Sequence, residues 1–192
     1  MPGRRWQDLR VPFDPADRPR APLHEDAAVT PDGRVAQRTL RGIHDHLRAE
    51  MAQVVRAVRA ASTDAQGAAD ARALVAGMTM GVSFRALGSF CGQYCSVVDL
   101  HHRIEDAALF PDLRAADPEL GPVLDRLSVE HVVVHEVLVE LDRALVAMAR
   151  AGAEELPAVQ DAVQRLSDDL LDHLAYEEQE LLPALGRLGL RV

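Results

Sequence analysis

Apolar residues recur at intervals of three and four through most of the chain, which is the spacing of one face of an α-helix. Four stretches show this pattern, and none shows the alternation of a strand. Their inward stripes are Leu40, Ile43, Leu47, Met51, Val54 and Val58; Leu87, Phe90, Tyr94, Val98, His101 and Glu105; Leu124, Leu127, His131, Val134, His135, Leu138, Leu141 and Leu145; and Val159, Val163, Leu166, Leu170, His173, Glu177 and Leu181. The pattern predicts an all-α, up-down four-helix bundle.

Breaks in the pattern predict where the helices end. The polar segment 62–67 is expected to end the first helix, and a short helix is expected over 68–77. Phe110-Pro111 should end or kink the second long helix, because proline cannot continue the backbone ladder. Asp117-Pro118 is a start signal for the third helix.

The first 33 residues differ from the rest, because they are rich in proline and show no periodicity. We expect residues 1–33 to form an extended arm along the domain, anchored by Trp6 and Phe13. Residues 34–192 are then the helical bundle, a length that fits one domain.

Composition excludes several classes of function. The net charge of −9, with no basic stripe, argues against nucleic-acid binding. No run of about 18 apolar residues is present, so no membrane span is predicted. Cys91 and Cys95 match neither a disulfide framework nor a redox pair, which favours a reducing, cytoplasmic location. Histidine is over-supplied, with eight His against one Trp, two Tyr and four Phe.

Every inward stripe has histidine on its face, since His44 is in phase with Leu40 and Leu47 on the first helix, and glutamate falls on two of the stripes. Pairs at i and i+4 stack on one helix side, close enough to share a metal ion. The set is His44, His101, Glu105, His131, His135, His173 and Glu177. So many polar groups in an aliphatic core destabilise it unless something binds them. Zinc usually takes four ligands, fewer than this set offers. Two iron ions fit better: with both carboxylates and an oxo or hydroxo group as bridges, one coordination position stays open for O₂ or peroxide.

The motifs that carry these residues resemble the hemerythrin-like, HHE cation-binding family. They are His44-Asp45-His46-Leu47, His101-His102-Arg103-Ile104-Glu105-Asp106, His131-Val132-Val133-Val134-His135 and His173-Leu174-Ala175-Tyr176-Glu177-Glu178, and they cover about residues 36–187. The resemblance implies a four-helix bundle around a non-haem di-iron centre. It implies that His131, His135 and His173 bind one iron and that His44 and His101 bind the other. Glu105 and Glu177 would bridge them.

Three of these ligands have a neighbour that stays open as an alternative: His46 for His44, His102 for His101, and Glu178 for Glu177. Glu177 is preferred because it stands four residues after His173, the spacing that His101 and Glu105 also show. On the same inward faces, Tyr94, Leu47 and Val98 are expected to line a ligand pocket.

The leading hypothesis is a non-haem di-iron protein that binds O₂, nitric oxide or peroxide, in O₂ handling or sensing or in the oxidative-stress response. The alternative, which the resemblance allows, is a di-iron enzyme with peroxide-decomposing or oxidase activity. Iron storage ranks third, because no acidic relay lies on the inner faces. The sequence identifies no catalytic residue beyond the metal ligands. A monomer or homodimer is expected, and a sensor would need a separate signalling partner.

Overall fold

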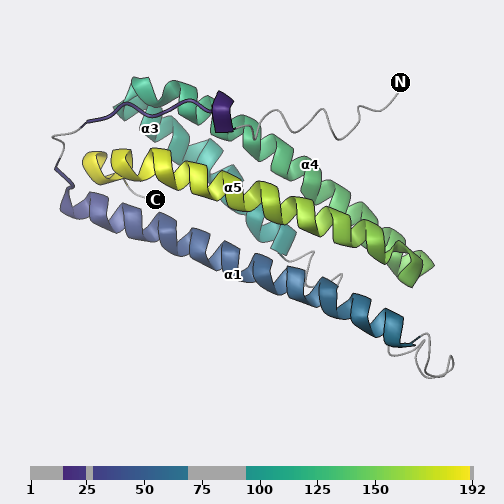
Figure 1. The fold of residues 1–192 in the computed structure, drawn as a ribbon. Coiled ribbons are helices and arrows are strands. Elements are labelled where there is room, and N and C mark those ends of the chain that lie inside the picture. The colour runs from purple at the N-terminus through teal and green to yellow at the C-terminus, as the bar shows by residue number, and fades with distance from the viewer. Residues whose placement is uncertain (1–14, 25–27, 69–93, 191–192) are drawn as a thin grey trace, which may run out of the picture. The chain divides into compact units, whose positions relative to one another are not determined.

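The computed structural model describes residues 15–24, 28–68 and 94–190. The long α-helices are α1 (Pro31–Ala68), α4 (Gly121–Ala151) and α5 (Leu156–Leu188). Another helix covers 94–104 and continues through a π-helical turn, η4 (Glu105–Leu109), into α3 (Phe110–Ala116). Short 3₁₀ turns are η3 (Pro15–Asp17), η5 (Pro118–Leu120) and η6 (Ala153–Glu155). No strand occurs in this part of the chain, and the predicted all-α bundle is confirmed (Figure 1).

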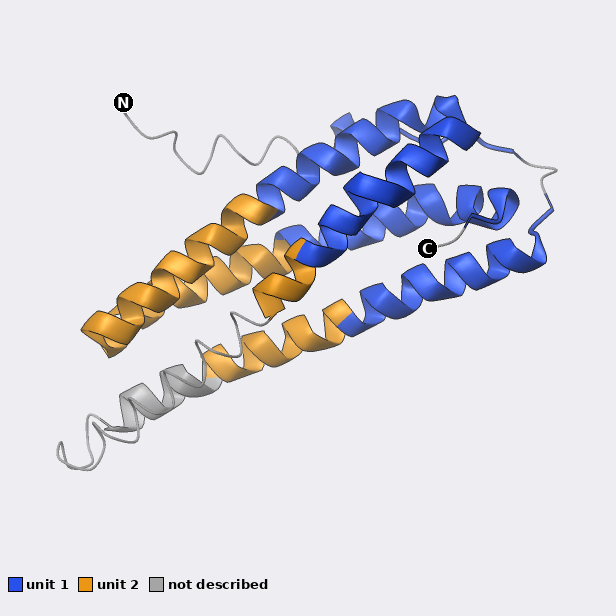
Figure 2. Cartoon of the chain, turned by 180° about the vertical axis from the view of Figure 1, so that it is seen from behind, with its two compact units in different colours: residues 1–46, 100–134, 169–192 blue, residues 47–99, 135–168 orange. Residues whose placement is uncertain are grey.

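The chain divides into two compact units (Figure 2). Unit 1 consists of residues 1–46, 100–134 and 169–192, and unit 2 of residues 47–99 and 135–168. The core of unit 1 is mostly aliphatic and includes Leu40, Leu109, Leu113, Leu120, Leu124, Leu127, Leu181 and Leu185. Buried apolar residues of unit 2 include Met51, Val54, Leu141, Met148, Val159 and Leu166. Many of these residues belong to the stripes that the sequence pattern predicts, for example Leu40, Leu124 and Leu181 in unit 1 and Met51, Leu141 and Leu166 in unit 2. The stripes do not include Leu109, Leu113, Leu120, Leu185 and Met148.

The first helix is longer than the sequence predicts. Its start is capped by Thr30, whose hydroxyl accepts a hydrogen bond from the Gly33 amide at 2.9 Å. The expected break at 62–67 is wrong, because α1 continues to Ala68. That segment contains one glycine and no proline, so every residue can still donate its helical hydrogen bond. The rest of the short helix expected over 68–77 lies outside the described residues.

The second helix bends rather than ends at its proline. The Phe110 amide bonds back to the Glu105 carbonyl, five residues earlier, which closes a π-helical turn. Pro111 lacks an amide hydrogen and its ring crowds the preceding turn, so a widened turn just before it relieves the clash. The helix then continues as α3. This turn begins at Glu105, one of the expected metal ligands.

Part of the N-terminal arm lies against the helices of unit 1. Tyr176 donates a hydrogen bond to the Pro19 carbonyl at 2.8 Å, and the Ala21 amide donates to Glu180 at 2.6 Å. Trp6 and Phe13, the expected anchors, lie outside the described residues. Over the part of the chain that the structure describes, no helix is long and apolar enough to cross a membrane.

The beginning of α1 and the end of α5 approach each other through two glycines. A Cβ atom added to Gly33 would stand 2.0 Å from the carbonyl oxygen of Gly186. The Thr30 amide donates to that same carbonyl at 2.9 Å. The obstacle is the backbone of Gly186 and not a flexible side chain. A side chain at position 33 could therefore fit only if the two helices moved apart.

We expect Gly33→Ala to lower the free energy of unfolding by about 1–3 kcal/mol, because it forces these backbones apart. Gly42 in the same helix is the matched control, since a Cβ there meets nothing within 4 Å. Gly42→Ala should raise stability by about 0.5–1 kcal/mol, the ordinary helix preference for alanine. Urea titration of both variants measures the difference. Equal shifts in both would show that the close approach does not constrain the fold.

Candidate metal centre

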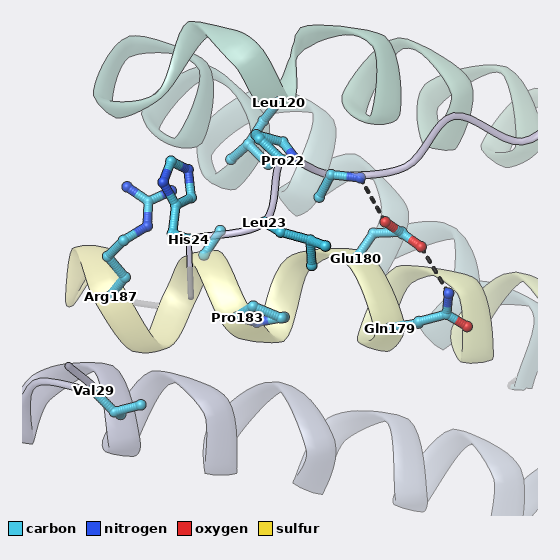
Figure 3. Close-up of a pocket in the computed structure, with 11 residues that line it drawn as sticks. Pro22, Leu23, His24, Val29, Leu120, Gln179, Glu180, Pro183 and Arg187 are labelled. Atoms are coloured by element: carbon cyan, nitrogen blue, oxygen red, sulfur yellow. Dashed lines mark hydrogen bonds between the residues drawn. The ribbon is translucent and has the colours of Figure 1, made fainter. Parts of the chain in front are cut away.

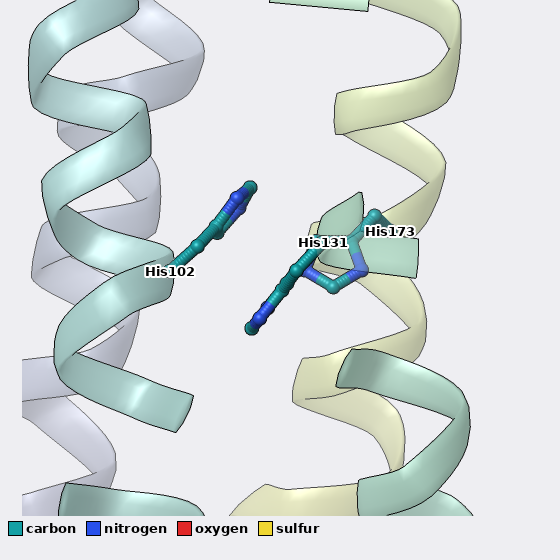
Figure 4. A group of neighbouring side chains, drawn as sticks. All are labelled: His102, His131 and His173. Atoms are coloured by element: carbon teal, nitrogen blue, oxygen red, sulfur yellow. The ribbon is translucent and has the colours of Figure 1, made fainter. Parts of the chain in front are cut away.

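Three histidines from three helical segments meet inside unit 1 (Figure 4). They are His102 from the 94–104 helix, His131 from α4 and His173 from α5, and all three are buried. One nitrogen of each lies within 4.8 Å of the others. The rings of His102 and His131 stack with centroids 4.1 Å apart, and His173 meets His131 edge-on at 4.9 Å. We call this the three-histidine group.

A second buried group, also in unit 1, combines two histidines with two glutamates: His44, His101, Glu105 and Glu177. Their ligand atoms also lie within 4.8 Å of one another. His101 Nε2 is 3.2 Å from Glu105 Oε1, and His44 Nε2 is 3.6 Å from Glu177 Oε2. We call this the mixed group.

The two glutamates connect the groups. Glu105 points Oε1 toward His101 of the mixed group, while its Oε2 is 3.5 Å from His131 Nε2. Glu177 Oε2 lies 3.6 Å from His44 Nε2 and 3.8 Å from His173 Nε2. Each carboxylate therefore has an oxygen near both groups, which is the placement of a bridging ligand.

The ring nitrogens that face away from the centre meet carboxylates. His44 Nδ1 is 2.9 Å from Glu178 Oε1, His131 Nδ1 is 3.0 Å from Asp106 Oδ2, and His173 Nδ1 is 3.1 Å from Glu130 Oε2. A carboxylate at Nδ1 favours the tautomer that carries its proton there. The lone pair of Nε2 then points into the centre, as a metal ligand requires.

In the metal-free chain, burial favours the neutral form of five groups of the centre: Glu105, Glu177, His101, His102 and His173. It raises the pKa of Glu177 to about 8. Burial and the charge of Glu177 together hold the pKa of Glu105 well above its usual value. Burial and the adjacent His44 lower the pKa of His101 to about 3, and burial lowers the pKa of His102 and His173 as well. A bound cation reverses this balance for the carboxylates, because it stabilises their charged form.

The polar atoms of the centre fit metal ions. The Nε2 atoms of His101, His102, His131 and His173 are buried and make no hydrogen bond, and neither do the carboxylate oxygens of Glu105 and Glu177. Leaving one such group unsatisfied costs about 1–3 kcal/mol. Neutral imidazoles and carboxylates are the ligands that iron and related metals take. Metal binding would therefore satisfy all of these atoms together.

The structure does not bring His135 into either group. Its side chain is 57% exposed, and its Nδ1 lies 3.0 Å from Asp99 Oδ1. The buried face of α4 runs through Leu127, His131, Val134 and Leu138, so His135 falls at the edge of the stripe. This departs from the ligand set that the sequence predicts, in which His135 completes a site with His131 and His173.

In the structure, His102 lies with His131 and His173, the two histidines that the sequence groups with His135. From the sequence, His102 is only an alternative to His101, because His101 has the spacing to Glu105. A usable signal was present, since His102 stands four residues after Val98 and seven before Leu109, both of which are buried. The π-helical turn begins at residue 105, three residues after His102. Both His101 and His102 are buried.

The structure places the members of the other two alternative pairs, Glu177 or Glu178 and His44 or His46, in different surroundings. Glu177 belongs to the mixed group, while Glu178 contacts the far side of His44. His44 is buried and His46 is exposed. The sequence does not predict that Asp106 lies beside His131 or that Glu130 lies beside His173, because each contact joins two helices that are distant along the chain.

The three residues expected to line a ligand pocket lie in unit 2. Tyr94, Leu47 and Val98 are all buried, and the Tyr94 hydroxyl donates to the Leu47 carbonyl at 3.1 Å. Burial raises the pKa of Tyr94, so the phenol stays protonated. Their role around a ligand stays a prediction.

A cavity of about 240 Å³ lies elsewhere in unit 1, between the arm and α5 (Figure 3). Pro22, Leu23 and His24 line it from the arm, and Pro183 and Arg187 line it from α5. It contains no residue of the three-histidine group or the mixed group.

A helical bundle that buries adjacent groups of histidine and glutamate is a metal-binding protein. The chain matches the family model of the hemerythrin HHE cation-binding domain over residues 30–185, and it belongs to that family. Comparison with curated proteins and with solved structures finds no match. Family membership indicates that the centre binds metal ions, usually iron.

Proposed function

We propose that the chain is a non-haem di-iron protein that binds O₂ or a related small ligand, nitric oxide or peroxide, at an open iron position. Its role is O₂ handling or sensing, or the response to oxidative stress. The observation that carries the proposal is the pair of adjacent groups that Glu105 and Glu177 connect. The proposal includes a cytoplasmic location, which the cysteine pattern supports.

The division of ligands supports two metal ions and one open position. The three-histidine group offers three imidazoles, and the mixed group offers two besides the two glutamates. If both carboxylates bridge, the ion held by His44 and His101 has one protein ligand fewer than its neighbour. Iron bound there would be a redox-active ion with a position at which a small molecule such as O₂ can bind.

Neighbouring side chains keep the centre dry and oriented. The ring of Phe110 stacks on His131, with centroids 5.4 Å apart. Asp106 Oδ2 lies 3.0 Å from the outer nitrogen of that imidazole, and Ser128 in turn donates to Asp106 at 2.7 Å. Exclusion of water and fixed imidazoles are the conditions under which a small ligand competes well for an open metal position.

The test is anaerobic reconstitution with Fe(II), followed by metal analysis and absorption spectra under nitrogen and then air. We expect about two iron ions per chain and a charge-transfer band that appears with O₂ and disappears when O₂ is removed. His131→Ala should lose about half of the iron and the O₂-dependent band, because it removes one ligand of the three-histidine group. Absence of bound iron would overturn the proposal. Steady O₂ release from H₂O₂ would show the enzymatic alternative, and many irons per chain would show storage.

A further inference from the structure

The side chain of one arginine of the N-terminal arm is buried against the helices of unit 1. The Arg18 side chain is only 5% exposed, although it follows directly on the short turn η3. Its guanidinium lies over the Tyr176 ring at 4.5 Å and 2.9 Å from Asp172 Oδ2. Since Tyr176 also donates to the Pro19 carbonyl, this part of the arm is held at Pro19 as well as at Arg18.

Arg18 binds the carboxylate that holds a metal-facing histidine. Its Nε donates to Glu130 Oε1 at 2.9 Å and its Nη2 donates to Oε2 at 3.0 Å. Glu130 Oε2 is also the atom that meets His173 Nδ1, at 3.1 Å. The Glu130 side chain is fully buried. One carboxylate oxygen is therefore shared between the arm and the three-histidine group.

We propose that Arg18 is a positioning residue for the three-histidine group. It fixes Glu130 against His173, so that docking of residues 15–24 determines how firmly the group holds a metal ion. A planar, two-pronged contact fixes the carboxylate plane, which a single contact does not. The metal part of this inference rests on the proposed function, while the effect on the His173 ring does not.

The chain should fold without Arg18. Glu130 keeps a second cationic partner, because Arg126 Nε donates to Oε1 at 2.9 Å. Loss of Arg18 therefore does not leave the buried charge alone, which would be strongly destabilising. What is lost is the restraint on Oε2, the oxygen that faces His173.

Arg20 provides a matched control on the same segment. It is 64% exposed and pairs with Glu180 at 2.8 Å, the residue that also accepts from the Ala21 amide. Glu180 is in neither metal group. Arg20→Ala thus removes a charge and a contact of the arm without touching Glu130.

The first measurement needs no metal. In metal-free protein labelled with ¹⁵N-histidine, we expect the Nδ1 proton of His173 to exchange with water about 10-fold faster in Arg18→Ala, since its acceptor is less restrained. Arg20→Ala should match the unmodified chain. The proposal is overturned if Arg18→Ala leaves the exchange unchanged, or if both variants change it equally.

The second measurement is transfer of Fe(II) from the loaded protein to a chelator. Loss should be about 10-fold faster in Arg18→Ala and unchanged in Arg20→Ala, the size seen when outer partners of metal ligands are removed. If Arg18 acts through Glu130, the double variant Arg18→Ala, Glu130→Gln should lose iron no faster than Glu130→Gln alone. Fully additive effects would contradict the proposal. An unmodified chain that binds no iron would refute the proposed function, while the proton exchange still decides the role of Arg18.

Discussion

Replacing His102 with alanine should remove about half of the bound metal, whereas the same change at His135 should leave the metal content unchanged. His102 supplies one of the three nitrogens of the three-histidine group, and its ring stacks on a second ligand, His131. Losing it leaves that ion with two histidines. His135 is exposed and pairs with Asp99, outside both groups.

The measurement is iron content after anaerobic reconstitution of both variants, next to the unmodified chain. Melting curves of the metal-free proteins serve as the folding control, because His102→Ala also removes buried volume. The opposite outcome, loss of iron in His135→Ala and full loading in His102→Ala, would support the ligand set expected from the sequence and refute the arrangement in the structure.

The second large effect is expected at Glu105. Glu105→Gln should weaken iron binding by more than about 100-fold, beyond the range for outer partners, because a bridging anion is lost from both ions. The fold should tolerate the change. The pKa of Glu105 in the metal-free chain is raised by burial and by Glu177, so its neutral form is favoured there, and glutamine has the same shape and no charge.

Glu178→Gln is the matched control for this prediction. Glu178 lies on the same helix as Glu177, is in neither group, and has its Oε1 2.9 Å from the outer nitrogen of His44. Its replacement should weaken iron binding by about 10- to 100-fold, a smaller effect than that of Glu105→Gln. Iron titrations in competition with a chelator rank the two. Equal effects would show that Glu105 does not bridge the two groups.

Local spacing predicted a large part of this molecule. Leucines and valines at intervals of three and four define the buried faces of α1, α4 and α5, and those residues are the ones in the core. The same spacing found six of the seven residues in the two metal groups. The predicted end of the first helix at 62–67 is wrong for a local reason, since polar residues without proline do not by themselves stop a helix.

The exchange of His135 for His102 shows where spacing stops being informative. Residues at i and i+4 are about 40° apart around a helix axis, so either member of a pair can lie at the edge of the buried stripe. Which one faces the centre depends on how the whole helix is rotated against its neighbours. On α4 that rotation buries Val134 and Leu138 and leaves His135 exposed.

By itself the sequence determined the helical class, the aliphatic faces and the stock of histidine and glutamate that the core must hold, because these follow from local periodicity. Only the tertiary structure decided that His102 lies with His131 and His173, and that Glu177 belongs to the mixed group while Glu178 contacts the outer nitrogen of His44. It alone placed Glu130 on His173 and Arg18 on Glu130, a contact between residues 112 positions apart. Such contacts are set by how helices pack, and no local pattern in the chain encodes them.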